Sequence, residues 1–136
     1  MLSQKQFVRI VRASAAYDVL ATAAFVSPWS FALLLELLRS VHLMLGLPGQ
    51  IPSFAPTHML LANLLGAVVL VWSAVRLHLG LPLLGRYDAV ARALFAVLQV
   101  YAVAAGASPL LLLFTAFEVV FGIAQALPYA RDAVER

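Results

Sequence analysis

The most constraining feature of this sequence is a set of four apolar stretches, each about as long as a bilayer is thick. They cover residues 7–26, 57–75, 87–105 and 109–127. A helix needs about 20 mostly apolar residues to cross the hydrocarbon core. Because backbone groups in lipid must find their hydrogen-bond partners internally, helices are the expected state of these runs. The sequence therefore predicts an all-α integral membrane protein, a four-helix transmembrane bundle built as a single domain over residues 1–136.

Composition supports this class of protein and excludes others. Hydrophobic residues make up 64% of the 136 residues and charged residues 11%, whereas soluble domains are about half apolar and a quarter charged. A soluble chain this short could not bury so much apolar surface, because small domains leave a large share of their surface exposed. The absence of cysteine excludes disulfides, thiolate nucleophiles and cysteine-based metal sites. No basic patch is interleaved with aromatic residues, so a nucleic-acid partner is not expected.

The segment 28–45 is apolar enough to resemble a fifth span, but it carries Glu36, Arg39 and Ser40 on one side of a helix. A charge at the centre of a span costs about 2.5–3.5 kcal/mol on insertion scales. We therefore predict an interfacial helix over residues 28–45, between spans one and two, that lies on the membrane surface or caps the bundle. A kinked extension of the first helix is the alternative.

Proline and glycine mark where the helices begin and end. Ser27–Pro28 and Ser108–Pro109 each offer a hydroxyl for a helix N-cap and a proline for the first helical position. Repeated proline and glycine over residues 46–56 predict a loop. Trp29 and Trp72 fall near the expected membrane interfaces, as aromatic belt residues do.

The distribution of basic residues predicts the orientation. Lysine and arginine favour cytoplasmic segments, and the connection between spans one and two carries only Arg39, offset by Glu36. Both termini are therefore predicted to be cytoplasmic, in a bacterial inner membrane. The N-terminal segment is expected to remain as the first helix, with its cleavage as a signal peptide the alternative. The basic residues assigned to the cytoplasmic side are Lys5, Arg9, Arg12, Arg76, Arg86, Arg131 and Arg136.

Each predicted span carries one polar seam at helical spacing. Ionisable residues inside spans are costly and usually face the interior of the bundle, so four seams together predict a polar core. This core either joins the helices or lines a ligand cavity. The candidate cavity residues are Asp18, Asn63, Arg92, Gln99, Glu118 and Gln125. The full seams are Ser14, Asp18, Thr22 and Phe25; Asn63, Gly66, Leu70 and Ser73; Asp88, Arg92, Phe95 and Gln99; and Thr115, Glu118, Gly122, Gln125 and Tyr129.

Depth along the helices predicts a buried ion pair. At about 1.5 Å per residue, Asp18 lies roughly 9 Å beyond Arg12, and Arg92 lies roughly 9 Å beyond Arg86. The first and third spans run in the same direction, so Asp18 and Arg92 are predicted to pair. Asp88, four residues before Arg92 on the same face, is a second partner.

Glu118 is predicted to differ from the other charges. It lies near mid-membrane with no basic residue clearly at its level, and burial favours the protonated form of a carboxyl group. Gln99 and Asn63 are its candidate hydrogen-bond partners. His42 and His58 lack a surrounding cluster of ligands, so surface or interface positions are expected for both and no metal site is predicted.

Three features of the chain point to a family. They are the long connection over residues 28–56, the tight turn over residues 106–109, and the acidic Glu118 in the last span. In these the chain resembles DoxX-like and EXPERA-type small four-helix membrane proteins. The resemblance implies an apolar ligand such as a sterol in a cavity with a polar floor, and some EXPERA proteins isomerise such ligands with buried carboxylates. Only Asp18 and Glu118 match. The aromatic and histidine pairs of the isomerases are not evident, so isomerase chemistry is not expected.

These observations favour a protein that binds or carries a small apolar molecule, such as an isoprenoid, quinone or lipid, between its helices. The alternative is a structural or accessory subunit of a larger membrane complex, or a homo-oligomer. An enzyme that uses Glu118 or Asp18 as acid or base ranks below both. The expected partner in every case is the lipid bilayer, and no catalytic residue, cofactor or metal is predicted.

Overall fold

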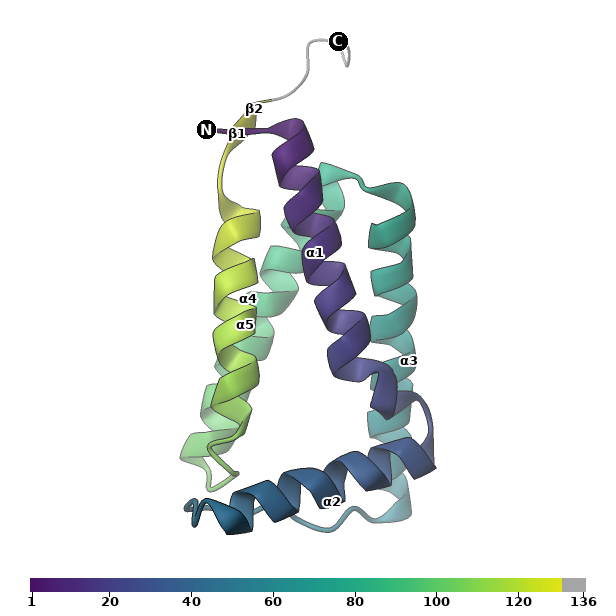
Figure 1. Ribbon diagram of the computed structural model, residues 1–136, viewed down its shortest axis with the longest axis vertical. Coiled ribbons are helices and arrows are strands. Elements are labelled where there is room, and N and C mark those ends of the chain that lie inside the picture. Colours follow the sequence, from purple (N-terminus) through teal and green to yellow (C-terminus); the bar gives the residue numbers. More distant parts are fainter. Residues whose placement is uncertain (131–136) are drawn as a thin grey trace.

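The computed structural model describes residues 1–130 as an assembly of helices with one short pairing of strands (Figure 1). The two strands have two residues each, and all the longer elements are helical. The all-α prediction is therefore confirmed. In chain order the elements are β1 (Leu2–Ser3), α1 (Gln4–Thr22), the short 3-10 helix η1 (Ala23–Val26), α2 (Pro28–Met44), α3 (Pro56–Leu79), α4 (Pro82–Ala104), α5 (Leu111–Ala126) and β2 (Tyr129–Ala130).

Two of the described helices are long and apolar enough to cross a membrane by themselves. They are α3, with 24 residues, and α4, with 23 residues. The α1–η1 segment and α2 qualify only as a pair, which is bent by 106° at Ser27, so they add at most a third span. The apolar α5 has 16 residues, about 24 Å of helix against a hydrocarbon core of about 30 Å. By length and apolar composition, the described helices therefore indicate a membrane protein with two spans, or three if the bent pair forms one span.

Helix boundaries follow the proline and glycine signals in part. The predicted cap at Ser27 is confirmed, because its side chain accepts a hydrogen bond from the backbone N–H of Ser30 and Pro28 begins α2. The predicted cap at Ser108 is wrong, because residues 109–110 form a turn and α5 begins only at Leu111. Helix α3 runs past the predicted end at residue 75 and stops at Gly80, whose φ of 60° suits glycine.

The helices form two pairs that meet over only part of their length. Helix α1 packs on α3, and α4 packs on α5 (Figure 1). The first pair is close enough that a side chain on Gly66 would collide with Phe25 of η1. Contact between the pairs is confined to the end that carries the termini. Beyond Asp18 in α1 and η1, and beyond Arg92 in α4, none of these helices' described residues is buried.

Helix α2 crosses from one pair to the other at the opposite end of the molecule (Figure 1). It starts beside η1, where Phe31 packs against Phe25. At its far end the buried His42 holds Ser108 in the α4–α5 turn, with 2.8 Å between Nδ1 and Oγ. The following loop bonds the same turn, since Gln50 N–H donates to the Gly106 carbonyl and Ser108 N–H donates to the Gln50 carbonyl. His42 is therefore buried and does not take the surface position that was one of the two expected for it.

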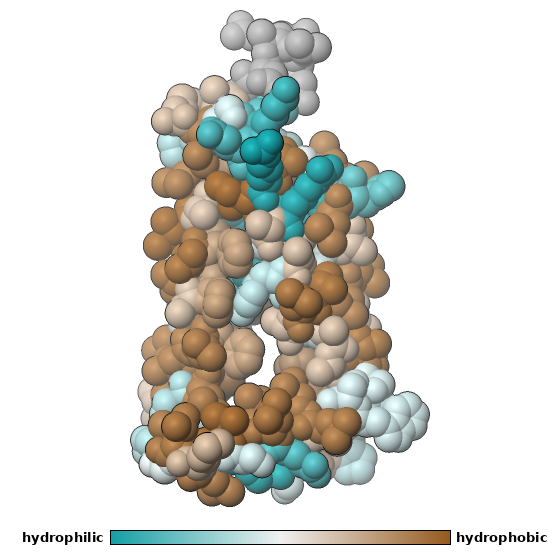
Figure 2. All heavy atoms as spheres, in the orientation of Figure 1, coloured by the Kyte–Doolittle hydropathy of each residue, from teal (hydrophilic) through white to brown (hydrophobic). Residues whose placement is uncertain are grey.

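The two helix pairs and α2 enclose an opening. Figure 2 shows a gap through the molecule just above α2, bordered mainly by apolar side chains. Polar side chains lie along the outer edge of α2 in the same view, and Glu36 and Ser40 are exposed. Helix α2 turns 106° away from the α1–η1 segment at Ser27, so the chain changes direction sharply between them.

The ends of the described chain are joined beside α1. β1 pairs in parallel with β2, with Leu2 opposite Tyr129, and the Phe7 and Tyr129 rings stack 4.5 Å apart. The guanidinium of Arg86 lies over the Phe7 ring and donates to the carbonyl oxygens of Gln125 and Leu127, both at 2.8 Å. The predicted cytoplasmic charges Arg131 and Arg136 lie outside the described residues.

Candidate functional site

The most unusual site in the described chain is a buried set of five charged side chains. They are Asp18 of α1, Arg76 of α3, Asp88 and Arg92 of α4, and Glu118 of α5, and we call them the charge cluster. All five are buried, and the two arginines are among the largest fully enclosed side chains. Every long helix except α2 thus contributes at least one charge to the same place.

Arg92 contacts all three carboxylates of the charge cluster. Its Nη2 lies 2.7 Å from Oδ2 of Asp18, its Nε lies 2.9 Å from Oδ2 of Asp88, and its Nη1 lies 2.8 Å from Oε2 of Glu118. The fork of five donors on a guanidinium makes such multiple pairing possible. Because the three carboxylates belong to α1, α4 and α5, Arg92 links three helices.

Arg76 completes the charge cluster from the opposite helix pair. It forms an ion pair with Asp18 through Nη2 and lies 2.6 Å from Oδ2 of Asp88 through Nη1. Its Nη2 also donates to the hydroxyl of Ser73, one turn earlier on α3, at 3.0 Å. Asp18 and Asp88 each bridge both arginines, whereas Glu118 contacts only Arg92.

Neutral polar groups surround these charges. The hydroxyl of Ser14 accepts from Arg76 at 3.0 Å and from the side-chain amide of Gln125 at 2.6 Å. The indole N–H of Trp72 donates to Oδ1 of Asp88 at 3.1 Å. Trp72 therefore contributes a donor to the charge cluster. Buried polar groups need such partners, because an unpaired one costs stability.

The pairing is nearly complete but the charges do not balance. Two arginines face three carboxylates, so the charge cluster carries a net charge of −1 when all five groups are ionised. Within residues 1–130, the buried side-chain atoms without a hydrogen-bond partner are Nε of Arg76 and Oε1 of Gln125. Each carboxylate has a cation beside it, which makes the arrangement well suited to joining helices.

The structure brings together some of the predicted site residues. The predicted Asp18–Arg92 ion pair is confirmed, and so is Asp88 as the second partner of Arg92. Gln125 joins them through Ser14. The expectation that Glu118 has no basic partner is wrong, because the long side chain of Arg92 reaches it.

Asn63 and Gln99 lie apart from the charge cluster. Asn63 donates to the carbonyl of Phe25 at 2.6 Å and so fastens η1 to α3. Gln99 accepts from the hydroxyl of Thr115 at 2.7 Å and so joins α4 to α5. Neither residue hydrogen-bonds Glu118 as predicted, because Asn63 bonds the Phe25 carbonyl and Gln99 bonds the Thr115 hydroxyl instead.

Arg76 is the main residue that the sequence interpretation missed. Its position beside a predicted loop favoured an exposed cytoplasmic charge, yet the side chain is fully buried. The signal that could have found it is the seam itself, because Arg76 lies three residues after Ser73 on the same face of α3. With Arg76 buried, the described basic residues that can support a cytoplasmic N-terminus are Lys5, Arg9, Arg12 and Arg86.

Aromatic rings close the side of the charge cluster between α1 and α5. The Tyr17 ring stacks on Phe117 with 4.6 Å between centroids and lies 5.6 Å from Phe121. The Arg92 guanidinium lies over the Phe121 ring at 5.2 Å. Such contacts exclude water and add to the attraction that holds a buried cation.

A separate apolar groove lies near the end of the molecule that carries α2. It has a volume of about 540 Å³ and is formed where η1, the start of α2, the end of the following loop and the start of α3 meet. Phe25, Phe31 and Phe54 supply aromatic walls, and Leu61 and Leu65 supply aliphatic ones. Glu118 and the other charged residues of the cluster do not line it.

Comparisons of the chain with family models, with curated proteins and with solved structures find no match. Within residues 1–130 no group of three or more histidine, aspartate or glutamate side chains is arranged to hold a metal ion. The geometry of the chain itself is therefore the basis for a functional proposal.

Proposed function

We propose that this chain is a four-span membrane protein that binds or carries a small apolar molecule between its two helix pairs. The opening above α2 is the observation that carries the proposal (Figure 2). Ligand pockets are usually concave, 300–1,000 Å³ in volume and lined mostly by apolar and aromatic side chains. The groove of about 540 Å³ has this size and lining, and it lies on the first helix pair and α2, with no residue of α4 or α5 in its walls.

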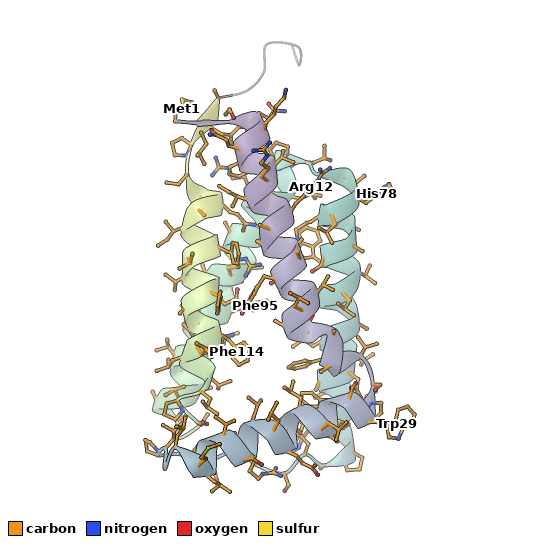
Figure 3. All side chains as sticks on the ribbon, in the orientation of Figure 1. Met1, Arg12, Trp29, His78, Phe95 and Phe114 are labelled. Carbon is orange, nitrogen blue, oxygen red and sulfur yellow. The ribbon has the colours of Figure 1, made fainter. Side chains whose placement is uncertain are left out.

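The charge cluster supports the proposal because it sets where the two helix pairs separate. The buried residues of α1 and α4 end at Asp18 and Arg92, so the helix pairs are packed together from the end with the termini as far as the charge cluster. Phe95 lies in the region between the pairs, and Phe114 lies nearer to α2 (Figure 3). Phe95 is 38% exposed although it follows Arg92 on the inward seam. An apolar molecule between the pairs would cover such side chains, at about 25 cal/mol for each Å² removed from water.

The proposed topology has α1–η1, α3, α4 and α5 as spans, with α2 on the outer surface of a bacterial inner membrane and both termini cytoplasmic. Lys5, Arg9 and Arg12 at the end with the termini support this orientation. At the other end, Trp29 is 79% exposed and projects away from the bundle, as an interfacial aromatic residue would (Figure 3).

Reporter fusions test the topology. A reporter fused after Arg136 is expected to show a cytoplasmic location, and one inserted in the loop at residues 46–55 is expected to show an external location. The reason is the excess of cationic residues at the end with the termini. A C-terminal reporter that reads as external would contradict the proposed orientation.

Lipid analysis of the purified protein tests ligand binding. We expect the wild-type chain to retain one apolar species above the background of bulk lipid. Thr22 lies one turn beyond Asp18 on the same inward face, so Thr22→Trp should fill the opening and lower the retained amount about tenfold or more, a loss of about 1.4 kcal/mol. Mass spectrometry of extracted lipids gives the measurement.

Leu20→Trp is the matched control for this experiment. It adds the same side chain in the same turn of α1, but Leu20 is 82% exposed, so retention should not change. If wild type retains no enriched species, or if both variants retain as much as wild type, the binding proposal fails.

A structural or accessory role is the second candidate function. The observation in its favour is that every charge of the cluster has an opposite partner, which is the arrangement expected of groups that join helices. The same lipid analysis separates the two candidates, because a purely structural subunit would retain no specific molecule.

A further inference from the structure

The end of the molecule that carries the termini has a second, basic groove. It has a volume of about 310 Å³ and is lined by Gln4, Lys5, Val8, Arg9 and Arg12. All five residues belong to α1, and Lys5, Arg9 and Arg12 lie three or four residues apart on one face of the helix. Figure 2 shows hydrophilic side chains gathered at this end of the visible face.

The three cations of this groove have no anionic partner in the described chain. Within residues 1–130 every ion pair belongs to the charge cluster. Arg86 and Arg39 are used in other ways, since each donates to backbone carbonyls. Lys5, Arg9 and Arg12 are all exposed, so the groove presents three positive charges to whatever lies beside α1.

Arg12 lies close to the end of α3. Its guanidinium lies against Gly80, at the C-terminus of α3, so close that a side chain at position 80 would come within 2.9 Å of Nη2. The end of a helix carries partial negative charge and attracts cations. In Figure 3 Arg12 lies at the same end of the bundle as His78, near the end of α3. Arg12 therefore borders the groove next to the end of α3.

We propose that this groove binds the phosphate headgroup of an anionic phospholipid in the leaflet next to the N-terminus. A phosphodiester carries one negative charge, which three cations without an ion-pair partner within residues 1–130 would attract, and arginine suits phosphate because its donors form a planar fork. The apolar Val8 between the cations offers a surface for the glycerol and the upper acyl chain. The cations spread over about 10 Å of helix axis from Lys5 to Arg12, as expected for side chains that reach a membrane surface from a tilted or descending helix.

The proposed topology determines which leaflet holds this lipid, so that part of the inference rests on the proposed function. Binding of the lipid does not depend on the apolar molecule above α2. The experiment uses the full chain in a neutral detergent and adds phosphatidylglycerol or phosphatidylcholine with the same acyl chains. Native mass spectrometry counts the bound lipid. Wild type is expected to bind phosphatidylglycerol more tightly than phosphatidylcholine. An equal affinity for the two lipids would overturn the proposal.

Charge variants locate the site. Arg9→Gln should weaken phosphatidylglycerol binding about fivefold, which is about 1 kcal/mol, the typical contribution of one basic residue near an anionic surface. Arg9→Lys should keep most of the affinity. The Lys5→Gln, Arg9→Gln and Arg12→Gln triple variant should lose the preference over phosphatidylcholine. Arg39→Gln, which removes a cation from α2 at the opposite end, should leave binding unchanged.

Three outcomes would contradict the groove as a lipid site. The triple variant could keep the preference, or Arg39→Gln could weaken binding as much as Arg9→Gln. Inorganic phosphate at the concentration of the lipid could displace phosphatidylglycerol, which would make the ligand a free anion. If the triple variant fails to fold, the comparison of Arg9→Gln with Arg9→Lys decides. The other two proposals are tested by separate experiments. The reporter fusions test the topology, and the lipids retained by wild type and Thr22→Trp test the binding of the apolar molecule.

Discussion

Replacing Arg92 with glutamine is expected to destabilise the protein more than any other single change in the charge cluster. Arg92 contacts Asp18, Asp88 and Glu118, so its loss leaves three carboxylates with Arg76 as the only cation. Removing one partner of a buried ion pair typically costs about 3–5 kcal/mol, because the remaining charge is stranded. Unfolding in mixed micelles, followed by circular dichroism over a detergent titration, measures the free energy of unfolding.

Arg9→Gln is the matched control for Arg92→Gln. Both changes remove a guanidinium from a helix, but Arg9 is exposed and lies outside every ion pair of the described chain, so stability should change by less than about 0.5 kcal/mol. Arg92→Lys should fall between the two, because it keeps the charge but not the fork of donors. The Arg92→Gln, Asp18→Asn double variant should recover part of the loss. An Arg92→Gln protein as stable as Arg9→Gln would show that the charge cluster does not hold the helices together.

Neutralising Glu118 is expected to have a much smaller effect than neutralising either aspartate. Glu118→Gln leaves two arginines facing two carboxylates, so it removes the excess negative charge while glutamine keeps a similar shape. Asp18→Asn and Asp88→Asn each remove a carboxylate that bridges both arginines. We expect a loss of about 3 kcal/mol or more for each aspartate and of less than about 1 kcal/mol for Glu118→Gln, within the range of mild substitutions.

The same micelle titration compares these three variants directly. Each changes one carboxylate to the corresponding amide, so the variants control for one another in size and shape. If Glu118→Gln lowers the free energy of unfolding as much as Asp18→Asn, removal of the excess negative charge does not compensate for the lost contact with Arg92. Glu118 would then contribute as much to stability as the aspartates.

Much of the fold follows from local patterns in the sequence. The apolar runs and the proline and glycine signals predicted five helical segments, and a helix lies over each. The turn at Ser27 and Pro28 follows from cap chemistry. The direction of α2 does not, because it depends on where His42 and Gln50 find partners, and those partners lie in a turn more than 50 residues later in the chain.

The charge cluster was predictable where it depends on spacing along helices. Asp88 lies one turn before Arg92, and Asp18 reaches Arg92 at a matched depth. Counting residues along a helix estimates the depth of each backbone position, however, and not how far a long side chain extends from it. Arg92 therefore reaches Glu118 across a difference in level that the count treated as too large. Arg76 was missed for a related reason, since the apolar run ends before it while the helix continues to Leu79.

The placement of the charges also bears on how the chain enters the membrane. Each helix pair brings its own arginine: the first pair holds Asp18 with Arg76, and the second holds Asp88 and Glu118 with Arg92. In the proposed four-span topology, a nascent segment would shield its carboxylates with a cation from the same pair before the other pair has been synthesised, which would lower the cost of charge in lipid. Docking of the pairs then shares partners, as Arg92 takes hold of Asp18 and Arg76 takes hold of Asp88. Biogenesis can proceed in two stages, each with its charges largely compensated.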